Sequence, residues 1–301
     1  MTDLHVETSG SGAPLLFIHG WGMHGGMWGG VAAKLAERFC VHVVDLPGHG
    51  LSRKSEDASE KTIAEDRESK GVGKLSANSQ LASGELGLHS IIRQLSAQFA
   101  GPLSVCGWSL GGQIALRWAM LEPHKIQRLA LVSSTPCFVQ QPDWTCAMTA
   151  DTLAGFAAAL AGNHTQTLRR FLALQVRGSE QERELLASLR NALFSRGAPD
   201  PAALQTGLDI LRDCDLRAAL PGIPQPTLLI AGGRDTLTPL PASEYMASVM
   251  PAARLATIEG ASHVPFLSHP EIFVEQLNNF LHAGIPPKFR ISGWQAGHGV
   301  A

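Results

Sequence analysis

Short apolar runs alternate with longer amphipathic segments along most of the chain. Runs rich in aliphatic and β-branched residues, each ending in glycine or polar residues, are typical of buried strands. They cover residues 15–19, 41–45, 103–106, 129–133, 227–231 and 254–258. Between them, helical spacing of apolar residues appears over 28–38, 91–99, 113–121, 242–250 and 271–281. This alternation predicts an α/β fold with a mostly parallel, twisted sheet flanked by helices.

One long block interrupts the alternation. Residues 137–220 are dominated by Ala, Leu, Arg and Gln and contain no strand-like run. We therefore expect a helical cap over 137–220, inserted into a core formed by residues 1–136 and 221–284.

Two further stretches depart from the pattern. Residues 53–80 are rich in Lys, Arg, Asp and Glu and poor in large apolar side chains. This composition favours a mobile surface insertion over the alternative of one solvated helix across residues 60–70. Residues 285–301 contain Gly and Pro without periodicity, which predicts a poorly packed tail.

Composition limits the class of protein. With 301 residues and 45% hydrophobic content, the chain can bury one large core, and a net charge of −2 does not favour a nucleic-acid or membrane-surface protein. The cysteines show no CxxC spacing, so we expect buried small apolar residues and no metal site. They are Cys40, Cys106, Cys137, Cys146 and Cys214. The chain shows neither a signal peptide nor an apolar run of about 18 residues, and we expect a cytoplasmic protein.

The strongest chemical motif is Gly107-Trp108-Ser109-Leu110-Gly111. It follows a predicted strand and precedes a predicted helix, which is the context in which G-x-S-x-G forms a nucleophile elbow. A side chain at either glycine would collide with the neighbouring backbone of so tight a turn. The alternative is a small-residue turn that only lets the helix pack on its strand. The candidate nucleophile is Ser109.

A serine hydroxyl becomes a good nucleophile only with a base and a carboxylate that orients the base. After a nucleophile elbow of this kind they are expected in the chain order Ser, Asp or Glu, His. Asp235 lies just past the predicted strand 227–231, and His263 lies in a loop after the last strand. Taken singly, each has a structural alternative: a turn-capping aspartate and a packed loop histidine. Order and strand-end placement together favour a Ser109, Asp235, His263 triad.

An oxyanion needs about two backbone N–H donors, one from the residue after the nucleophile and one from the loop after an early strand. Leu110 supplies the first, and Trp21 in His19-Gly20-Trp21-Gly22 is placed to supply the second. Glycine-rich loops also bind phosphate, but neither G-x-x-x-x-G-K nor G-x-G-x-x-G occurs here. We therefore expect no cofactor.

These motifs and further blocks resemble the pimeloyl-[acyl-carrier protein] methyl ester esterases, α/β hydrolases of biotin synthesis. The blocks are residues 19–22, 44–48, 107–112, 134–138, 170–175, 207–211 and 263–270. The first three are shared with many α/β hydrolases, whereas the Phe-Leu-Ala-Leu-Gln run at 171–175 is more diagnostic. The clearest departure is the 53–80 insertion, which the familiar members lack and which either gates access or decorates the surface.

The resemblance implies a serine carboxylesterase that hydrolyses the methyl ester of pimeloyl-acyl-carrier protein and frees the distal carboxylate. It also implies an acyl channel lined by 171–175 and a set of substrate-binding residues. These are Trp21, Ser109, Leu110, Phe171, Leu172, Ala173, Leu174, Gln175 and His263. Spacing alone favours a different role for the apolar members of the run, namely a cap helix packing on the core.

The substrate of that family is carried on an acidic acyl carrier protein, which basic side chains on the cap should attract. Between Gln166 and Arg196 arginines outnumber glutamates: Arg169, Arg170, Arg177, Arg183, Arg190 and Arg196 against Glu180, Glu182 and Glu184. Arg170 and Arg183 match family positions that meet the carrier protein, whereas other matching positions hold Gln166 and Ala187. A plain solvated helical face is the alternative.

The expected partner is thus the carrier protein, with no nucleic acid, no membrane and a monomeric chain. Two other functions stay open at this point. One is a broad-specificity short-chain carboxylesterase without a carrier partner, and the other is a catalytically idle hydrolase-fold protein that binds a ligand in an apolar pocket. Dehalogenases and epoxide hydrolases are disfavoured because they resemble this fold but use aspartate at the position of Ser109.

Overall fold

The computed structural model describes residues 4–52 and 81–283. The predictions made for 53–80 and 285–301 lie outside the described residues. A seven-stranded sheet runs through the described part in the order β1-β3-β2-β4-β5-β6-β7. Its strands are β1 Val6–Ser9, β2 Ala13–Ile18, β3 Phe39–Val44, β4 Leu103–Trp108, β5 Ile126–Val132, β6 Thr227–Gly232 and β7 Ala253–Ile258.

All neighbouring pairs are parallel except β1 with β3, which is antiparallel. The predicted α/β fold is therefore confirmed, and each predicted strand is present. The strands β4 and β6 are buried at every position because helices cover both faces. The pattern did not predict β1, since this edge strand is largely exposed and carries no apolar run.

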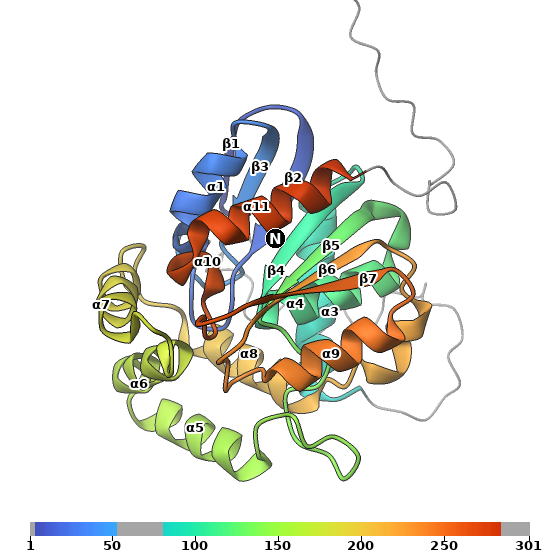
Figure 1. The fold of residues 1–301 in the computed structure, drawn as a ribbon. Helices are drawn as coiled ribbons and strands as arrows, with labels where there is room; N and C mark the ends of the chain where they lie inside the picture. Colours follow the sequence, from blue (N-terminus) through green and yellow to red (C-terminus); the bar gives the residue numbers. More distant parts are fainter. Residues whose placement is uncertain (1–3, 53–80, 284–301) are drawn as a thin grey trace, which may run out of the picture.

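Helices cover the two faces of the sheet (Figure 1). On one face α1 (Gly29–Leu35) packs against α11 (Pro270–His282). On the other face α3 (Ser83–Gln98) packs against α4 (Leu110–Leu121), and α9 (Leu240–Val249) lies along β6 and β7. Short helices complete these connections: η1 Gly25–Trp28, η3 Pro123–Lys125, η4 Arg217–Gly222 and α10 Pro265–Ser268.

An aromatic cluster joins the central strand to the first of these faces. The Trp28 ring lies 4.3 Å from the Phe266 ring, and Phe266 lies 5.0 Å from Trp108 at the end of β4. All three side chains are buried. Because aromatic pairs contribute beyond the area that they bury, this cluster fixes the end of β4, the strand that leads into Ser109.

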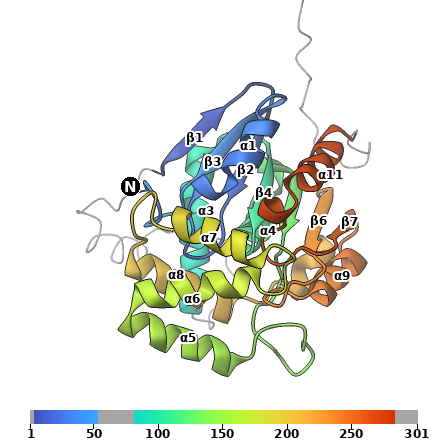
Figure 2. The ribbon, with the colours of Figure 1, turned by 60° about the vertical axis from the view of Figure 1, so that its left-hand side comes forward.

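The predicted cap segment, residues 137–220, contains α5 (Ala150–Gly162), α6 (His164–Val176), α7 (Glu182–Ala192) and α8 (Pro201–Asp213). These helices lie over the carboxyl ends of the strands (Figures 1 and 2). The contact between α8 and α3 is extensive, and the glycines Gly84 and Gly87 of α3 face α8 in it. No helix in the described residues is both long and apolar enough to cross a membrane.

The two glycines of α3 give a test of this packing. A Cβ at Gly84 would lie 2.2 Å from the Asp209 carbonyl oxygen in the backbone of α8, whereas a Cβ at Gly87 would meet only side-chain atoms, the nearest being the Thr206 methyl group at 2.6 Å. We expect Gly84→Ala to lower the free energy of unfolding by about 1–3 kcal/mol despite the better helix propensity of alanine. The matched Gly87→Ala variant should change it by less than about 1 kcal/mol in urea denaturation. Equal effects would contradict the role of the Gly84 contact.

Candidate active site

Ser109 occupies a strained turn between β4 and α4, with φ 54° and ψ −116°. A non-glycine residue in this region of conformational space costs on the order of 1–3 kcal/mol, so the surroundings must hold it there. The Ser109 N–H donates to the Val132 carbonyl at 2.9 Å, and its own carbonyl accepts from the Ser134 hydroxyl at 2.8 Å. The backbone at Ser109 thus forms the tight strand-to-helix turn that the sequence predicts.

The glycines around Ser109 are required by close backbone approaches. A Cβ on Gly107 would collide with the backbone of Gly111, and a Cβ on Gly111 would collide with the Ile18 and His19 carbonyls. Only glycine permits this packing of the start of α4 against β2. The turn therefore presents Ser109 beside the loop that follows β2.

Asp235 and His263 form a buried hydrogen-bonded pair. The His263 Nδ1 donates to Asp235 Oδ2 at 2.8 Å, and both side chains are at most 1% exposed. Asp235 also accepts from the Leu237 and Thr238 N–H groups at 2.9 and 3.1 Å and from the Thr238 hydroxyl at 2.8 Å. With Nδ1 as the donor, Nε2 of the neutral ring carries the lone pair.

The electrostatics favour an ionised Asp235. Burial by itself would raise the pKa of this carboxyl, but the charge and hydrogen bond of His263 and the bonds from Thr238 outweigh it. The net effect is a pKa below the usual range. The carboxylate can therefore fix the ring and stabilise an imidazolium.

Trp108 links the histidine loop to the elbow. Its indole N–H donates to the His263 carbonyl at 2.9 Å, and the Trp108 and His263 rings lie 5.9 Å apart. Since Trp108 directly precedes Ser109, the loop that carries the candidate base is held at the residue next to the candidate nucleophile. The structure thus brings all three predicted triad residues into one region, while their catalytic roles stay predictions.

The loop after β2 lies against the nucleophile. A Cβ on Gly20 would come within 3.2 Å of the Trp108 ring and 3.4 Å of the Ser109 Cβ. The Gly20 carbonyl accepts from His19 Nδ1 at 2.8 Å and from the Met23 N–H at 3.2 Å. In a trans peptide the C=O and N–H point in opposite directions, so these two bonds fix the direction of the Trp21 N–H.

His19 is the centre of this arrangement. Its Nε2 accepts from the Leu46 N–H at 3.0 Å while its Nδ1 donates to Gly20, so both ring nitrogens are engaged only when the ring is neutral. Burial, together with the neighbouring His49, lowers the pKa of His19 to about 3. The sequence motif contains His19, but only the structure assigns it this contact.

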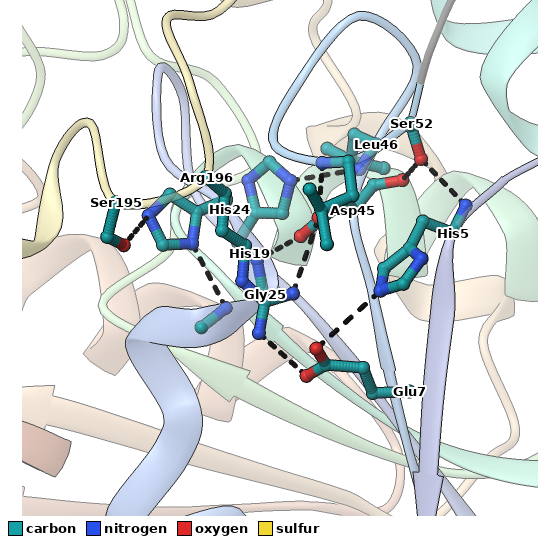
Figure 3. A network of polar contacts seen from close by, with 12 residues as sticks. His5, Glu7, His19, His24, Gly25, Asp45, Leu46, Ser52, Ser195 and Arg196 are labelled. Carbon is teal, nitrogen blue, oxygen red and sulfur yellow. Dashed lines mark hydrogen bonds and ion pairs between the residues drawn. The ribbon is translucent and has the colours of Figure 1, made fainter.

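A buried polar network extends from His19 to the cap segment (Figure 3). Asp45 accepts from the Gly25 N–H at 2.6 Å and the Leu51 N–H at 2.8 Å, and Arg196 lies 3.4 Å away. Arg196 also forms an ion pair with Glu7 of β1 at 2.7 Å. Burial would raise the pKa of Asp45, but the two backbone bonds and the neighbouring positive charge lower it. Arg196, one of the six arginines named above between Gln166 and Arg196, therefore links the cap segment to the sheet through Asp45 and Glu7.

An apolar cavity lies under the cap segment. Trp21 and Phe171 line it with their rings 4.9 Å apart, and other apolar side chains complete the lining. These are Phe138, Met148, Leu153, Phe156, Leu208 and Leu211. Sequence reasoning missed these six, because the lining comes from several elements that are distant along the chain. The Trp21 indole donates to the Leu204 carbonyl of α8 at 2.8 Å, which holds the wall of the cavity in place.

The members of the predicted run 171–175 have different environments. Phe171 faces the cavity, whereas Leu172 is fully buried in the core. Ala173 and Leu174 are half-buried, and Gln175 is buried with its carbonyl bonded to the histidine loop. Of the run, Phe171 is the residue that lines the cavity, and the channel role stays a prediction.

The predicted docking residues lie on the surface of the cap segment. Arg170 of α6 and Arg183 of α7 are exposed, as are Arg169, Arg177 and Arg190. Within residues 4–52 and 81–283 no acidic side chain forms an ion pair with any of these five. In the same part of the chain, no group of three or more His, Cys, Asp or Glu side chains is arranged to hold a metal ion. Three of the five cysteines are buried and two are half-buried.

Comparison with known proteins agrees with this architecture. The alpha/beta hydrolase family model matches residues 15–276, so the chain belongs to the α/β hydrolases. Within them it belongs to the pimeloyl-[acyl-carrier protein] methyl ester esterases. The relative of that name from Nitrosomonas europaea is 44% identical over 274 residues, covering 91% of this chain and 98% of its own. A second, from Nitrosospira multiformis, is 38% identical and covers 92% and 98%.

Two solved structures support the fold. An esterase from Exiguobacterium antarcticum matches with a TM-score of 0.76 at 23% identity, covering 93% of this chain and 96% of its own. A hydrolase from Pseudomonas aeruginosa matches with a TM-score of 0.72 at 25% identity, covering 93% and 94%.

The Asp235 contacts generate a first prediction on activity. Asp235→Asn replaces the acceptor that holds the His263 tautomer, so we expect kcat to fall by about 10³-fold or more. Thr238→Val removes only one of the bonds to the carboxylate, and kcat should fall by about tenfold. Steady-state kinetics on a simple ester would measure both. An Asp235→Asn enzyme whose kcat lies within tenfold of the wild-type value would contradict a role for the Asp235–His263 hydrogen bond in catalysis.

His19 generates a prediction on stability. Its pKa is about 3 in the folded protein and about 6.5 when unfolded, so the unfolded chain binds a proton first as pH falls below 6.5. This histidine should therefore remove about 2 kcal/mol of stability between pH 7 and pH 5. In urea denaturation across that range, His19→Gln should lose less stability than wild type. Parallel curves for the two proteins would refute this assignment.

Proposed function

We propose that this protein is a serine carboxylesterase that hydrolyses the methyl ester of pimeloyl-acyl-carrier protein, freeing the distal carboxylate during biotin synthesis. The observation that carries the proposal is the meeting of a strained serine, a buried His263–Asp235 pair and an apolar cavity at Trp21. The two relatives described above are named for this reaction, and this chain matches each of them over nearly its whole length. No cofactor takes part in the mechanism.

Acylation begins at Ser109. Nε2 of His263 accepts the hydroxyl proton as Oγ attacks the ester carbonyl carbon, giving a tetrahedral intermediate. The N–H groups of Trp21 and Leu110 stabilise its oxyanion, and pre-aimed donors of this kind contribute several kcal/mol each. His263 then protonates the departing methoxide oxygen, so that methanol is released and the acyl group stays on Ser109.

Deacylation uses the same groups in the reverse sense. His263 removes a proton from water, which attacks the acyl-enzyme carbonyl, and the Ser109 oxygen leaves as its proton returns. The product is the free carboxylate, while the thioester to the carrier is not touched. Asp235 fixes the ring through Nδ1 and stabilises the imidazolium formed at each step.

The apolar lining of the cavity matches the chemistry of the methylene chain of the acyl group. Each methylene moved from water to an apolar environment contributes about 0.8 kcal/mol. We assign the acyl channel to the wall that Phe171 and Trp21 form, with the rest of the run, Leu172 to Gln175, shaping the helix behind it. The division into a core (1–136 and 221–284) and a cap (137–220) belongs to this proposal, with the cap closing the channel.

The carrier protein is the proposed partner. Arg170 and Arg183 are exposed on the cap and form no ion pair with an acidic side chain of the described residues, so they can meet an acidic surface. Such contacts raise the association rate more than the final affinity and weaken with salt. We propose a monomeric, cytoplasmic enzyme that binds neither nucleic acid nor membranes.

Ser109→Ala tests the chemistry. Removing the nucleophile should lower kcat by at least about 10³-fold and abolish covalent labelling by a fluorophosphonate. Circular dichroism should confirm that the fold is intact. A Ser109→Ala enzyme with wild-type rates would overturn the mechanism, and a wild-type enzyme that resists labelling would indicate an idle binding protein.

The substrate is tested separately. The value of kcat/KM for the carrier-bound methyl ester should exceed that for a short p-nitrophenyl ester by more than tenfold, and a smaller ratio would favour a broad-specificity esterase. The double variant Arg170→Glu/Arg183→Glu should raise KM for the carrier-bound ester by about tenfold and leave dimethyl pimelate unaffected. Arg38→Glu, at the opposite end of the strands, is the control for a charge reversal far from the cap and should change neither.

A further inference from the structure

The end of helix α6 bonds directly to the loop that carries His263. The Gln175 carbonyl accepts from the Ser262 hydroxyl at 2.5 Å and from the His263 N–H at 3.0 Å. The Ser262 Oγ also accepts from the His263 N–H at 2.6 Å. Gln175 and Ser262 are each 1% exposed. Because the last carbonyls of a helix have no partner within it, this bond satisfies a group that burial would otherwise leave unpaired.

The loop that follows α6 makes a second set of contacts in the same place. The Glu180 N–H donates to the Gly260 carbonyl at 3.3 Å. Arg234, next to Asp235, donates to the Gly178 carbonyl at 3.2 Å and pairs with Glu180 at 3.1 Å. The end of α6 and the loop that follows it thus contact the loop of Asp235 and the loop of His263.

One helical turn before Gln175, Phe171 faces the apolar cavity. Because both residues belong to one turn of α6, a movement of the helix would shift both the side chain that lines the cavity and the carbonyl that holds the histidine loop. Phe171 packs edge-on against Trp21 and against Phe156 of α5 at 5.9 Å. An acyl chain in the cavity would press on the same helix that fixes His263.

We propose that Ser262 is a positioning residue that couples occupation of the acyl cavity to the placement of the His263 base, through the Gln175 carbonyl of α6. This inference rests on the proposed function. A displacement of about 1 Å at a catalytic group is enough to lower the rate by about 100-fold. A short buried hydrogen bond that positions His263 therefore affects the rate of the chemical step. The preference for a long acyl chain should then appear in kcat and not only in KM.

The test uses two methyl esters with the same leaving group: methyl butyrate, which fills little of the cavity, and dimethyl pimelate. Ser262→Ala should lower kcat for dimethyl pimelate by about 30-fold and for methyl butyrate by less than about tenfold, with KM changed by less than about threefold. In a Phe171→Ala background, the loss on Ser262→Ala should be equal for the two esters, because the cavity contact is already removed.

Ser268→Ala is the matched control. Ser268 is also a buried serine whose hydroxyl donates to a backbone carbonyl, that of Val264, and within the described part of the chain it forms no hydrogen bond with His263. This variant should retain the wild-type kcat ratio for the two esters. Thermal unfolding of each variant would show that it is folded at the assay temperature.

The coupling is overturned if Ser262→Ala lowers kcat equally for both esters, if it changes only KM, or if it has no effect. The outcome is independent of the carrier-bound substrate, since both esters are free small molecules. Failure of the proposed function would instead appear as a low preference for the carrier-bound ester, with the kcat ratio of the free esters unchanged.

Discussion

The catalytic region depends on one steric constraint, the close approach of backbone segments where β4 passes into α4 at Ser109. Glycines on both sides of that residue let the start of α4 lie directly against the carbonyls of Ile18 and His19. The approach places the loop after β2 beside the serine and forces the serine itself into a strained conformation. Hydrogen bonds with Val132 at the end of β5 and with Ser134 just after it stabilise this strained conformation. Without the turn, neither the nucleophile nor the loop of the candidate oxyanion hole would have its position.

The cap segment supports this region at two separate places. Helix α8 holds Trp21 through the Leu204 carbonyl, and helix α6 holds the histidine loop through the Gln175 carbonyl. In both cases a side chain or N–H of the core donates to a backbone carbonyl of a helix, so the contact depends on where the helix lies more than on its side chains. A segment attached in this way can form the wall of the apolar cavity and at the same time fix the candidate catalytic groups.

The polar network around Asp45 explains how a cap of this kind stays in register with the sheet. Arg196 joins the segment between α7 and α8 to the ends of β3 and β1, and the buried neutral His19 joins the same region to the loop of Trp21. Buried charges are tolerated there because Asp45 accepts backbone and guanidinium hydrogen bonds. The network thus connects the cap, the sheet edge and the candidate oxyanion loop.

The sequence by itself determined the parallel sheet, the elbow at Ser109 and the chain positions of Asp235 and His263, because apolar runs and glycine-dependent turns are local properties. It predicted a channel run at 171–175 only by resemblance. The tertiary structure alone decided that Phe171 faces the cavity while Leu172 enters the core, that the half-buried Arg196 pairs with Asp45, and that β1 adds an exposed edge strand. These features depend on contacts between segments far apart in the chain, such as Arg196 with Asp45 and Gln175 with Ser262, which no local pattern encodes.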